Sequence, residues 1–165
     1  MSARPTTPDE LPGIGLRLQA LGLDPSELGF APDEAFPQVY GVLTEWDLGG
    51  AVATVMSLRD GSASLYTTSA FGILGGGEHE SVRLAAVRHV QVAEDFLPQA
   101  VATTDRQHAA GDEVRYWLLT YDGVHLVRGS MAALRSGGDP TRALFVAAQY
   151  VLTELRRLVE GAPIS

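Results

Sequence analysis

The chain has 165 residues, a formal net charge of −8 and no cysteine or lysine. It is long enough for one hydrophobic core, and its composition excludes disulfides, thiolate zinc sites, cysteine nucleophiles and Schiff-base lysines. The acidic balance disfavours nucleic acid as a partner, and no apolar run is long enough to span a membrane. We therefore expect a cytoplasmic protein.

The first half of the chain predicts a helix followed by a three-stranded meander. Residues 1–8 are small, polar and proline-containing and predict a flexible tail, and residues 9–23 have the apolar spacing of a helix. Strands are expected over residues 39–46, 51–59 and 62–68. Asp60-Gly61 predicts a two-residue hairpin, because a type I′ turn requires positive φ at both central positions.

The second half predicts two long helices around a second hairpin. Residues 81–97 carry an apolar stripe of helical period that ends at Pro98, and residues 99–112 predict a loop. Two further strands are expected over residues 114–121 and 124–128, joined at Asp122-Gly123. After a flexible connector, Asp139-Pro140 predicts the start of a helix that runs to about residue 159.

The predicted order is α-β-β-β-α-β-β-α, which indicates the α+β class with a five-stranded antiparallel sheet and helices mainly on one face. One domain over residues 9–160 is expected, with tails at 1–8 and 161–165. This order resembles that of type III secretion chaperones and related small bacterial α+β domains. The resemblance implies a cytoplasmic, acidic, often homodimeric protein that binds other polypeptides.

The candidate binding site is the glycine-rich corner between the third strand and the middle helix, formed by Gly75, Gly76, Gly77, Glu78, His79 and Arg83. Consecutive glycines suit a tight turn, a close backbone approach or space for a ligand. Together with the final helix, this segment is similar to a family of uncharacterised bacterial proteins, a similarity that implies no activity.

Phosphate binding at this corner is disfavoured by charge. A carboxylate such as Glu78 or Glu80 at ~6 Å from a phosphate costs roughly 3 kcal/mol, whereas a helix N-terminus returns only ~0.3–1 kcal/mol. A simpler interpretation is that both acids stabilise the start of the helix. His79 could bind a metal or act as a base with a neighbouring glutamate, and Asp105, His108 and Asp112 could add ligands. Because adjacent helical residues diverge by about 100°, we expect no resident metal or cofactor.

Two further features of the sequence have alternative interpretations. His89 lies in the apolar stripe of residues 81–97 and is expected to be a core histidine. Arg115, Trp117, Leu119 and Tyr121 share one strand face, which mixes charge with large apolar area and suits a protein interface.

The leading prediction is therefore a non-catalytic cytoplasmic module that binds polypeptide and forms a homodimer. The alternative is a small-molecule or metal-binding protein, or an enzyme, with its site at residues 75–83. In that case His79 would ligate or titrate, and Arg83 would hold an anionic group one turn away. The nucleophile elbow of hydrolases, G-x-S-x-G, does not occur in the sequence.

Overall fold

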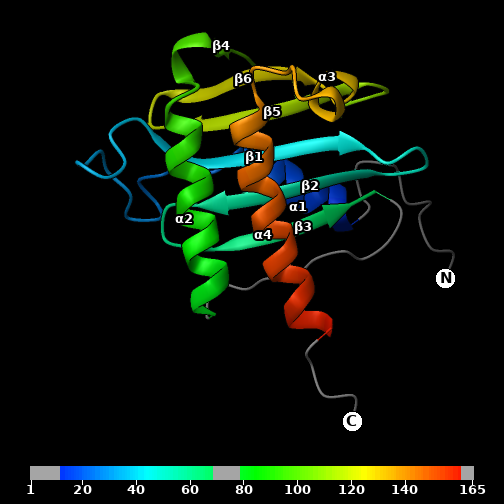
Figure 1. The fold of residues 1–165 in the computed structure, drawn as a ribbon. Helices are drawn as coiled ribbons and strands as arrows, with labels where there is room; N and C mark the ends of the chain where they lie inside the picture. Colours follow the sequence, from blue (N-terminus) through cyan, green and yellow to red (C-terminus); the bar gives the residue numbers. More distant parts are fainter. Residues whose placement is uncertain (1–11, 69–78, 161–165) are drawn as a thin grey trace, which may run out of the picture.

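A computed structural model describes residues 12–68 and 79–160 of the chain. This part has an α+β fold with four α-helices and a six-stranded antiparallel sheet in the order β3-β2-β1-β5-β6-β4 (Figure 1). The elements are α1 (Pro12–Leu21), β1 (Val39–Asp47), β2 (Val52–Leu58), β3 (Ala63–Thr67), α2 (Glu80–Glu94), the 3-10 helix η2 (Leu97–Gln99), β4 (Val101–Ala102), β5 (Glu113–Thr120), β6 (Gly123–Ser130), α3 (Met131–Ser136) and α4 (Arg142–Glu160).

The sheet consists of two antiparallel ribbons that meet where β1 pairs with β5. Both predicted hairpins, β2–β3 and β5–β6, are confirmed. The first turn is not of the expected type I′, because no residue other than glycine has positive φ in the described part of the chain. Instead, Gly61 N donates to Leu58 O, Leu58 N donates to Ser62 O, and Gly61 alone has a left-handed φ of 91°. This is the three-residue hairpin loop with a glycine bulge.

The expected count of five strands is wrong. Strand β4 lies in the segment that was predicted as a loop, and its Val101 and Ala102 pair with Leu126 and His125 of β6. A short helix, α3, also occupies the predicted flexible connector, between an N-cap at Ser130 and a left-handed Gly137. Elements of two and six residues are too short to show a hydrophobic period, so the sequence pattern could not indicate them.

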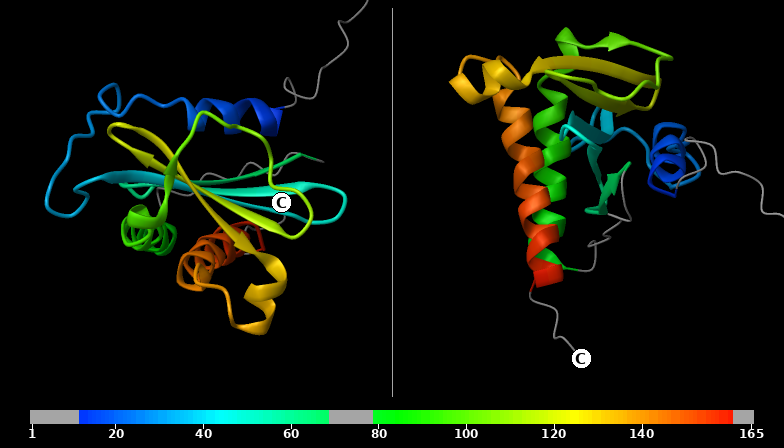
Figure 2. Two further views of the ribbon diagram at one scale, coloured as in Figure 1. Left: turned by 90° about the horizontal axis from the view of Figure 1, so that it is seen from above. Right: turned by 90° about the vertical axis from the view of Figure 1, so that its right-hand side faces the viewer.

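The helices form a layer on each side of the sheet. The long helices α2 and α4 run side by side across one face, and α1 lies on the opposite face (Figures 1 and 2). The expectation that helices cover mainly one face therefore holds for the two long helices and misses the position of α1. None of the helices in residues 12–68 and 79–160 has the length and apolarity required to cross a membrane.

The layer of α2 and α4 encloses the larger of two core clusters. The predicted stripe of the middle helix is confirmed, because Val82, Ala86, Val90 and Ala93 are completely buried. The helical spacing of apolar residues in α4 likewise predicts a buried stripe, and Leu144, Ala147, Ala148, Val151 and Leu155 are buried. A second cluster, on the side of α1, contains Trp117, Leu119, Leu43 and their neighbours. The sheet is thus buried on both faces. The exposed surfaces of the described part of the chain are the outer sides of the helices and the edges of the sheet.

Candidate functional site

The glycine-rich corner is described only at its end. Gly75, Gly76, Gly77 and Glu78 lie outside the described residues. His79 is the exposed N-cap of α2 and makes no side-chain capping bond, and Arg83 follows one turn later, also exposed. The stem of Arg83 packs on the β2–β3 turn, since a Cβ built on Gly61 would lie 2.1 Å from Arg83 Cγ. The prediction of a site at this corner stays a prediction.

The residues considered as additional metal ligands are engaged elsewhere. The Asp105 carboxylate lies 3.2 Å from an Arg115 nitrogen, and the Asp112 carboxylate accepts from the backbone N–H of Ala132 at 2.7 Å. Among residues 12–68 and 79–160, no three or more histidine, aspartate and glutamate side chains are grouped so that they could hold a metal ion.

The predicted interface face of β5 is covered in this structure. Trp117 and Leu119 are completely buried beneath α1, Arg115 is 7% exposed, and Tyr121 is partly buried. The Trp117 Nε1–H donates to the Asp105 carbonyl at 3.3 Å. A polypeptide could reach these residues only by displacing α1 and the loop that contains Asp105, and their role in binding stays a prediction.

The cover over this face, by which we mean α1 and the loop that contains Asp105, is held in place by a buried ion pair that the sequence analysis missed. Arg17 of α1 and Glu45 of β1 are 1% and 0% exposed, and the Arg17 Nη2 lies 3.1 Å from Glu45 Oε1. Glu45 also accepts from Thr54 Oγ1 at 2.6 Å and from the backbone N–H of Ala109 at 2.8 Å. The guanidinium of Arg17 lies 4.7 Å from the centre of the Trp117 ring.

This network has a structural rather than a catalytic arrangement. Arg17 also donates from Nη1 to the carbonyl of Arg106 and from Nη2 to the carbonyl of Gln107, at 2.8 and 3.2 Å. Each nitrogen of the Arg17 guanidinium and both oxygens of the Glu45 carboxylate therefore already have a hydrogen-bond partner in the protein. A substrate atom could replace one of these partners only if α1 and the loop around Asp105 moved away from the sheet. The sequence signal that could have indicated it is a glutamate in the middle of a strand that is largely apolar, between Leu43 and Trp46.

His89 is a core histidine, as expected, and both of its ring nitrogens are engaged. Its Nε2 lies 2.9 Å from Thr44 Oγ1 on β1, and its Nδ1 lies 2.8 Å from Ser57 Oγ on β2. Complete burial lowers the pKa of His89 from 6.5 to about 3, so the ring is neutral at physiological pH. Because His89 belongs to α2 and its two hydroxyl partners lie on β1 and β2, these hydrogen bonds position the helix on the sheet.

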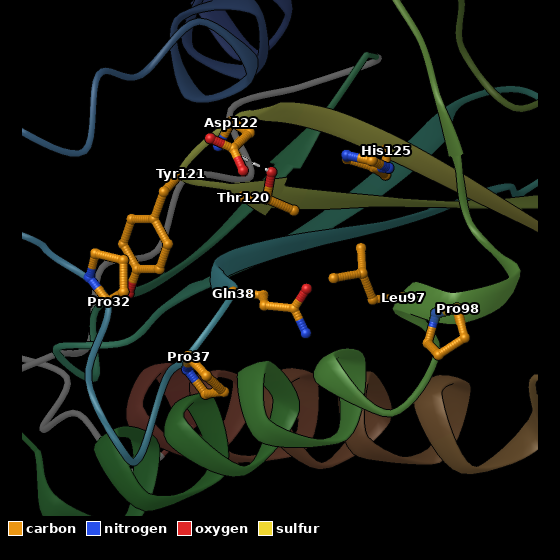
Figure 3. A pocket seen from close by; sticks show the side chains of 9 residues that line it. All are labelled: Pro32, Pro37, Gln38, Leu97, Pro98, Thr120, Tyr121, Asp122 and His125. Atoms are coloured by element: carbon orange, nitrogen blue, oxygen red, sulfur yellow. Dashed lines mark hydrogen bonds between the residues drawn. The ribbon is translucent and has the colours of Figure 1, made fainter.

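A first groove, of about 410 Å³, lies between the start of β1, η2 and the β5–β6 turn (Figure 3). Thr120 serves the turn itself, because its Oγ1 donates to Gly123 O and accepts from the Asp122 N–H, and Gln38 and His125 are further polar residues of the lining. The rest of its lining is largely apolar and includes Leu97 and three prolines. Asp122 is the one carboxylate of this lining, so the groove offers no cluster of charged groups to a ligand.

A second groove, of about 600 Å³, follows the edge of the sheet beside β4, β6 and the start of α4. We call it the edge groove; it is lined by Gln99, Val101, Ala102, Thr103, Leu126, Val127, Arg128, Gly129, Ser130, Asp139, Pro140 and Thr141. Val101 is 69% exposed, and β4 covers only a small part of β6. The groove therefore combines exposed apolar surface with strand backbone, which suits a polypeptide more than a small polar ligand.

The wall of the edge groove requires glycine at position 129. A Cβ on Gly129 would lie 2.6 Å from Thr141 Oγ1, and this hydroxyl is held by Asp139 and by the Tyr116 hydroxyl. Gly129→Ala is expected to lower the free energy of unfolding by about 1–3 kcal/mol through overpacking. Urea denaturation measures the change.

Gly138→Ala is the matched control for this prediction. A Cβ there would lie 3.8 Å from the nearest atom, in ordinary contact, and its φ is not positive. We expect a change of no more than about 1 kcal/mol. Equal effects of the two substitutions would contradict the overpacking argument.

Three large apolar side chains are exposed on the outside of the helix layer: Leu84 on α2, and Val146 and Tyr150 on α4.

Comparison of the chain with protein-family models, curated proteins and solved structures gave no match. The functional proposal therefore rests on these exposed surfaces and on the edge groove.

Proposed function

We propose that this chain is a non-catalytic, chaperone-like cytoplasmic module that binds polypeptide and forms a homodimer. The observation that carries the proposal is the exposed apolar surface on the outside of the α2–α4 layer. Leu84 and Tyr150 are 62% and 61% exposed, and Val146 is 39% exposed. Large apolar groups on neighbouring elements of one surface favour a protein contact.

The helix geometry places these side chains away from the core. Val146 and Tyr150 are four residues apart and therefore lie one above the other on α4, on the side opposite Leu144. Leu84 lies on the side of α2 that faces away from Val82 and Ala86. Because α2 and α4 run side by side, the three residues belong to one layer surface (Figure 1).

The charge of the chain favours polypeptide over nucleic acid. A net charge of −8 repels a phosphate backbone, and basic residues are scattered along the sequence. The alternative of a small-molecule or metal site at residues 75–83 has His79 and Arg83 as its described members, and both are exposed to solvent. Exposed polar side chains are common on protein surfaces, so the exposed apolar side chains of the α2–α4 layer are a more specific feature of this structure than His79 and Arg83.

Light scattering coupled to size-exclusion chromatography tests self-association. The wild-type chain is expected to have twice the mass of one copy, with an interface of about 1,200–2,000 Å² in total. The double variant Leu84→Glu/Tyr150→Glu is expected to weaken the dimer by about 100-fold or more, because a central apolar contact typically contributes about 2 kcal/mol. Circular dichroism checks that the variant is folded.

Leu48→Glu is the matched control, since Leu48 is 58% exposed in the β1–β2 turn, away from the helix layer. This variant is expected to remain a dimer. A wild-type chain that stays monomeric at high concentration would refute the homodimer. Equal loss in the control would show that the helix layer is not the interface.

A further inference from the structure

The edge of β6 is only partly covered, and this leaves one residue with open backbone groups. Alternate residues of a strand direct their N–H and C=O groups to the same side. On the outer side of β6, Val124 O accepts from Thr103 N, Leu126 is paired with Val101, and Ser130 N donates to Asp139 Oδ2 at 2.7 Å. Arg128 lies between Leu126 and Ser130 in the same series.

The N–H and C=O of Arg128 therefore point away from β5, toward the edge groove. No residue within 12–68 or 79–160 hydrogen-bonds them on that side, because the segment that would continue β4 is wound into η2 at Leu97–Gln99. Arg128 itself lines the edge groove. A donor and an acceptor in this arrangement match the backbone of one extended residue.

The side chains around Arg128 indicate which side chain a residue paired with its backbone would carry. Arg128 is directly opposite Arg115 on β5, and its side chain is 58% exposed. Glu113 lies 3.5 Å from Arg128 Nε and also pairs with Arg115, which has Asp105 at 3.2 Å as a second carboxylate partner, so Glu113 is the carboxylate paired with Arg128 in the described part of the chain. Like charges on neighbouring strands are unfavourable, so an acidic residue on the other side of Arg128 would give this exposed guanidinium a favourable cross-strand neighbour.

The residues on either side of that acid would meet a different surface. Their side chains would point to the face of Val127 and Gly129, and the groove there is bounded by Pro140 and Thr141. Because Thr141 packs directly on Gly129, the space suits small or apolar side chains. The preferred sequence is thus an acidic residue between two small or apolar residues.

We infer that the edge groove binds an extended segment of a partner polypeptide, which pairs with the Arg128 backbone and places an acidic side chain against the Arg128 guanidinium. This inference rests on the proposed polypeptide-binding function and specifies its site and the sequence that it selects. The strand edge, the groove of about 600 Å³ and the exposed arginine meet at this one position.

Two substitutions at one position separate the backbone from the side chain. Arg128→Ala removes the guanidinium and keeps the N–H, whereas Arg128→Pro removes both. Proline is compatible with the fold, because the N–H of residue 128 points away from β5 and proline is tolerated at such edge positions. The probe is a peptide selected from a randomised dodecapeptide library on the immobilised full chain, and its dissociation constant is measured by fluorescence anisotropy.

Selected peptides are expected to contain an acid between small or apolar residues. Arg128→Ala should weaken binding by up to about fivefold, and Arg128→Pro by at least about tenfold more, since the hydrogen bond from the N–H of residue 128 is lost and its acceptor on the peptide is left unpaired. Hydrogen exchange on the wild-type chain, which needs no variant, should show that the peptide protects the Arg128 amide.

Other outcomes would overturn the inference. If selected peptides bind Arg128→Pro as tightly as the wild type, or lose affinity only in the Leu84→Glu/Tyr150→Glu variant, the chain binds polypeptide elsewhere and the proposed function survives alone. If the library yields no binder, both proposals fail. A protected Arg128 amide in the isolated chain, or a monomeric Arg128→Pro variant of a dimeric protein, would identify this chain or its second copy as the occupant.

Discussion

Glu45→Gln is expected to lower the free energy of unfolding by about 3–5 kcal/mol, because it leaves the buried Arg17 guanidinium without its counter-charge. The glutamine amide can replace one accepting oxygen, but its NH₂ group would face donors of Arg17 or Ala109. The loss should appear first in the cover formed by α1, since Arg17 is the buried charge of this helix.

Urea denaturation measures the total loss, and hydrogen exchange of the β5 amides shows whether the cover opens locally. Glu113→Gln is the control, since its ion pairs are partly exposed and such pairs contribute only about 0–1 kcal/mol. In the double variant Arg17→Met/Glu45→Gln part of the stability should return, because no buried charge remains unpaired. A loss below about 1 kcal/mol in Glu45→Gln would contradict this account.

The elements that the sequence predicted correctly are those with a strong local signal. The stripe of Val82, Ala86, Val90 and Ala93 repeats at helical spacing, and the structure buries it completely. Asp-Gly pairs between apolar alternating segments located both hairpins, although in each pair only the glycine, Gly61 or Gly123, has positive φ. In these segments local preference and tertiary packing agree, so a single sequence is sufficient.

The β1 strand shows where the pattern of alternation fails. Strict alternation along a strand places Tyr40, Val42, Thr44 and Trp46 on one face. The register of β1 against β5 shifts between Val39 and Gly41, and this bulge turns Tyr40 to the side of α1. A Cβ on Gly41 would lie 2.7 Å from Leu58 Cδ2, so the shift depends on a close contact with a residue distant in sequence.

The candidate site was less predictable than the fold. Trp117 and Leu119 do share a strand face, but no local pattern identifies α1 as the element that covers them, because Arg17 and its partner Glu45 are 28 residues apart. The exposed surface of α2 and α4 follows from the same helical spacing that predicted their buried stripes. The open backbone of Arg128 depends on where β4 ends, which is a property of strand register and not of residue type.

The second large effect that we expect is a loss of stability at mildly acidic pH that originates from His89. The folded state keeps this ring neutral, since burial lowers the pKa of His89 to about 3, whereas the unfolded chain binds a proton near the ordinary value of 6.5. The unfolded state therefore binds more protons between these values. The contribution is fully present above about pH 6.5 and is lost as the pH falls toward 3, by about 1.4 kcal/mol per pH unit.

Over that window the loss from His89 would amount to about 4–5 kcal/mol, comparable with the total stability of a small domain. His89→Gln is the matched variant, because an amide can also donate and accept between Thr44 and Ser57 without titrating. Urea denaturation of both proteins from pH 7.5 to 4.5 gives the difference in their free energies of unfolding. The contributions of the other histidines and of the carboxylates cancel in this difference. The wild type should lose stability more steeply than His89→Gln below pH 6.5. Parallel curves would mean that the ring accepts a proton in the folded state, and that burial does not keep it neutral.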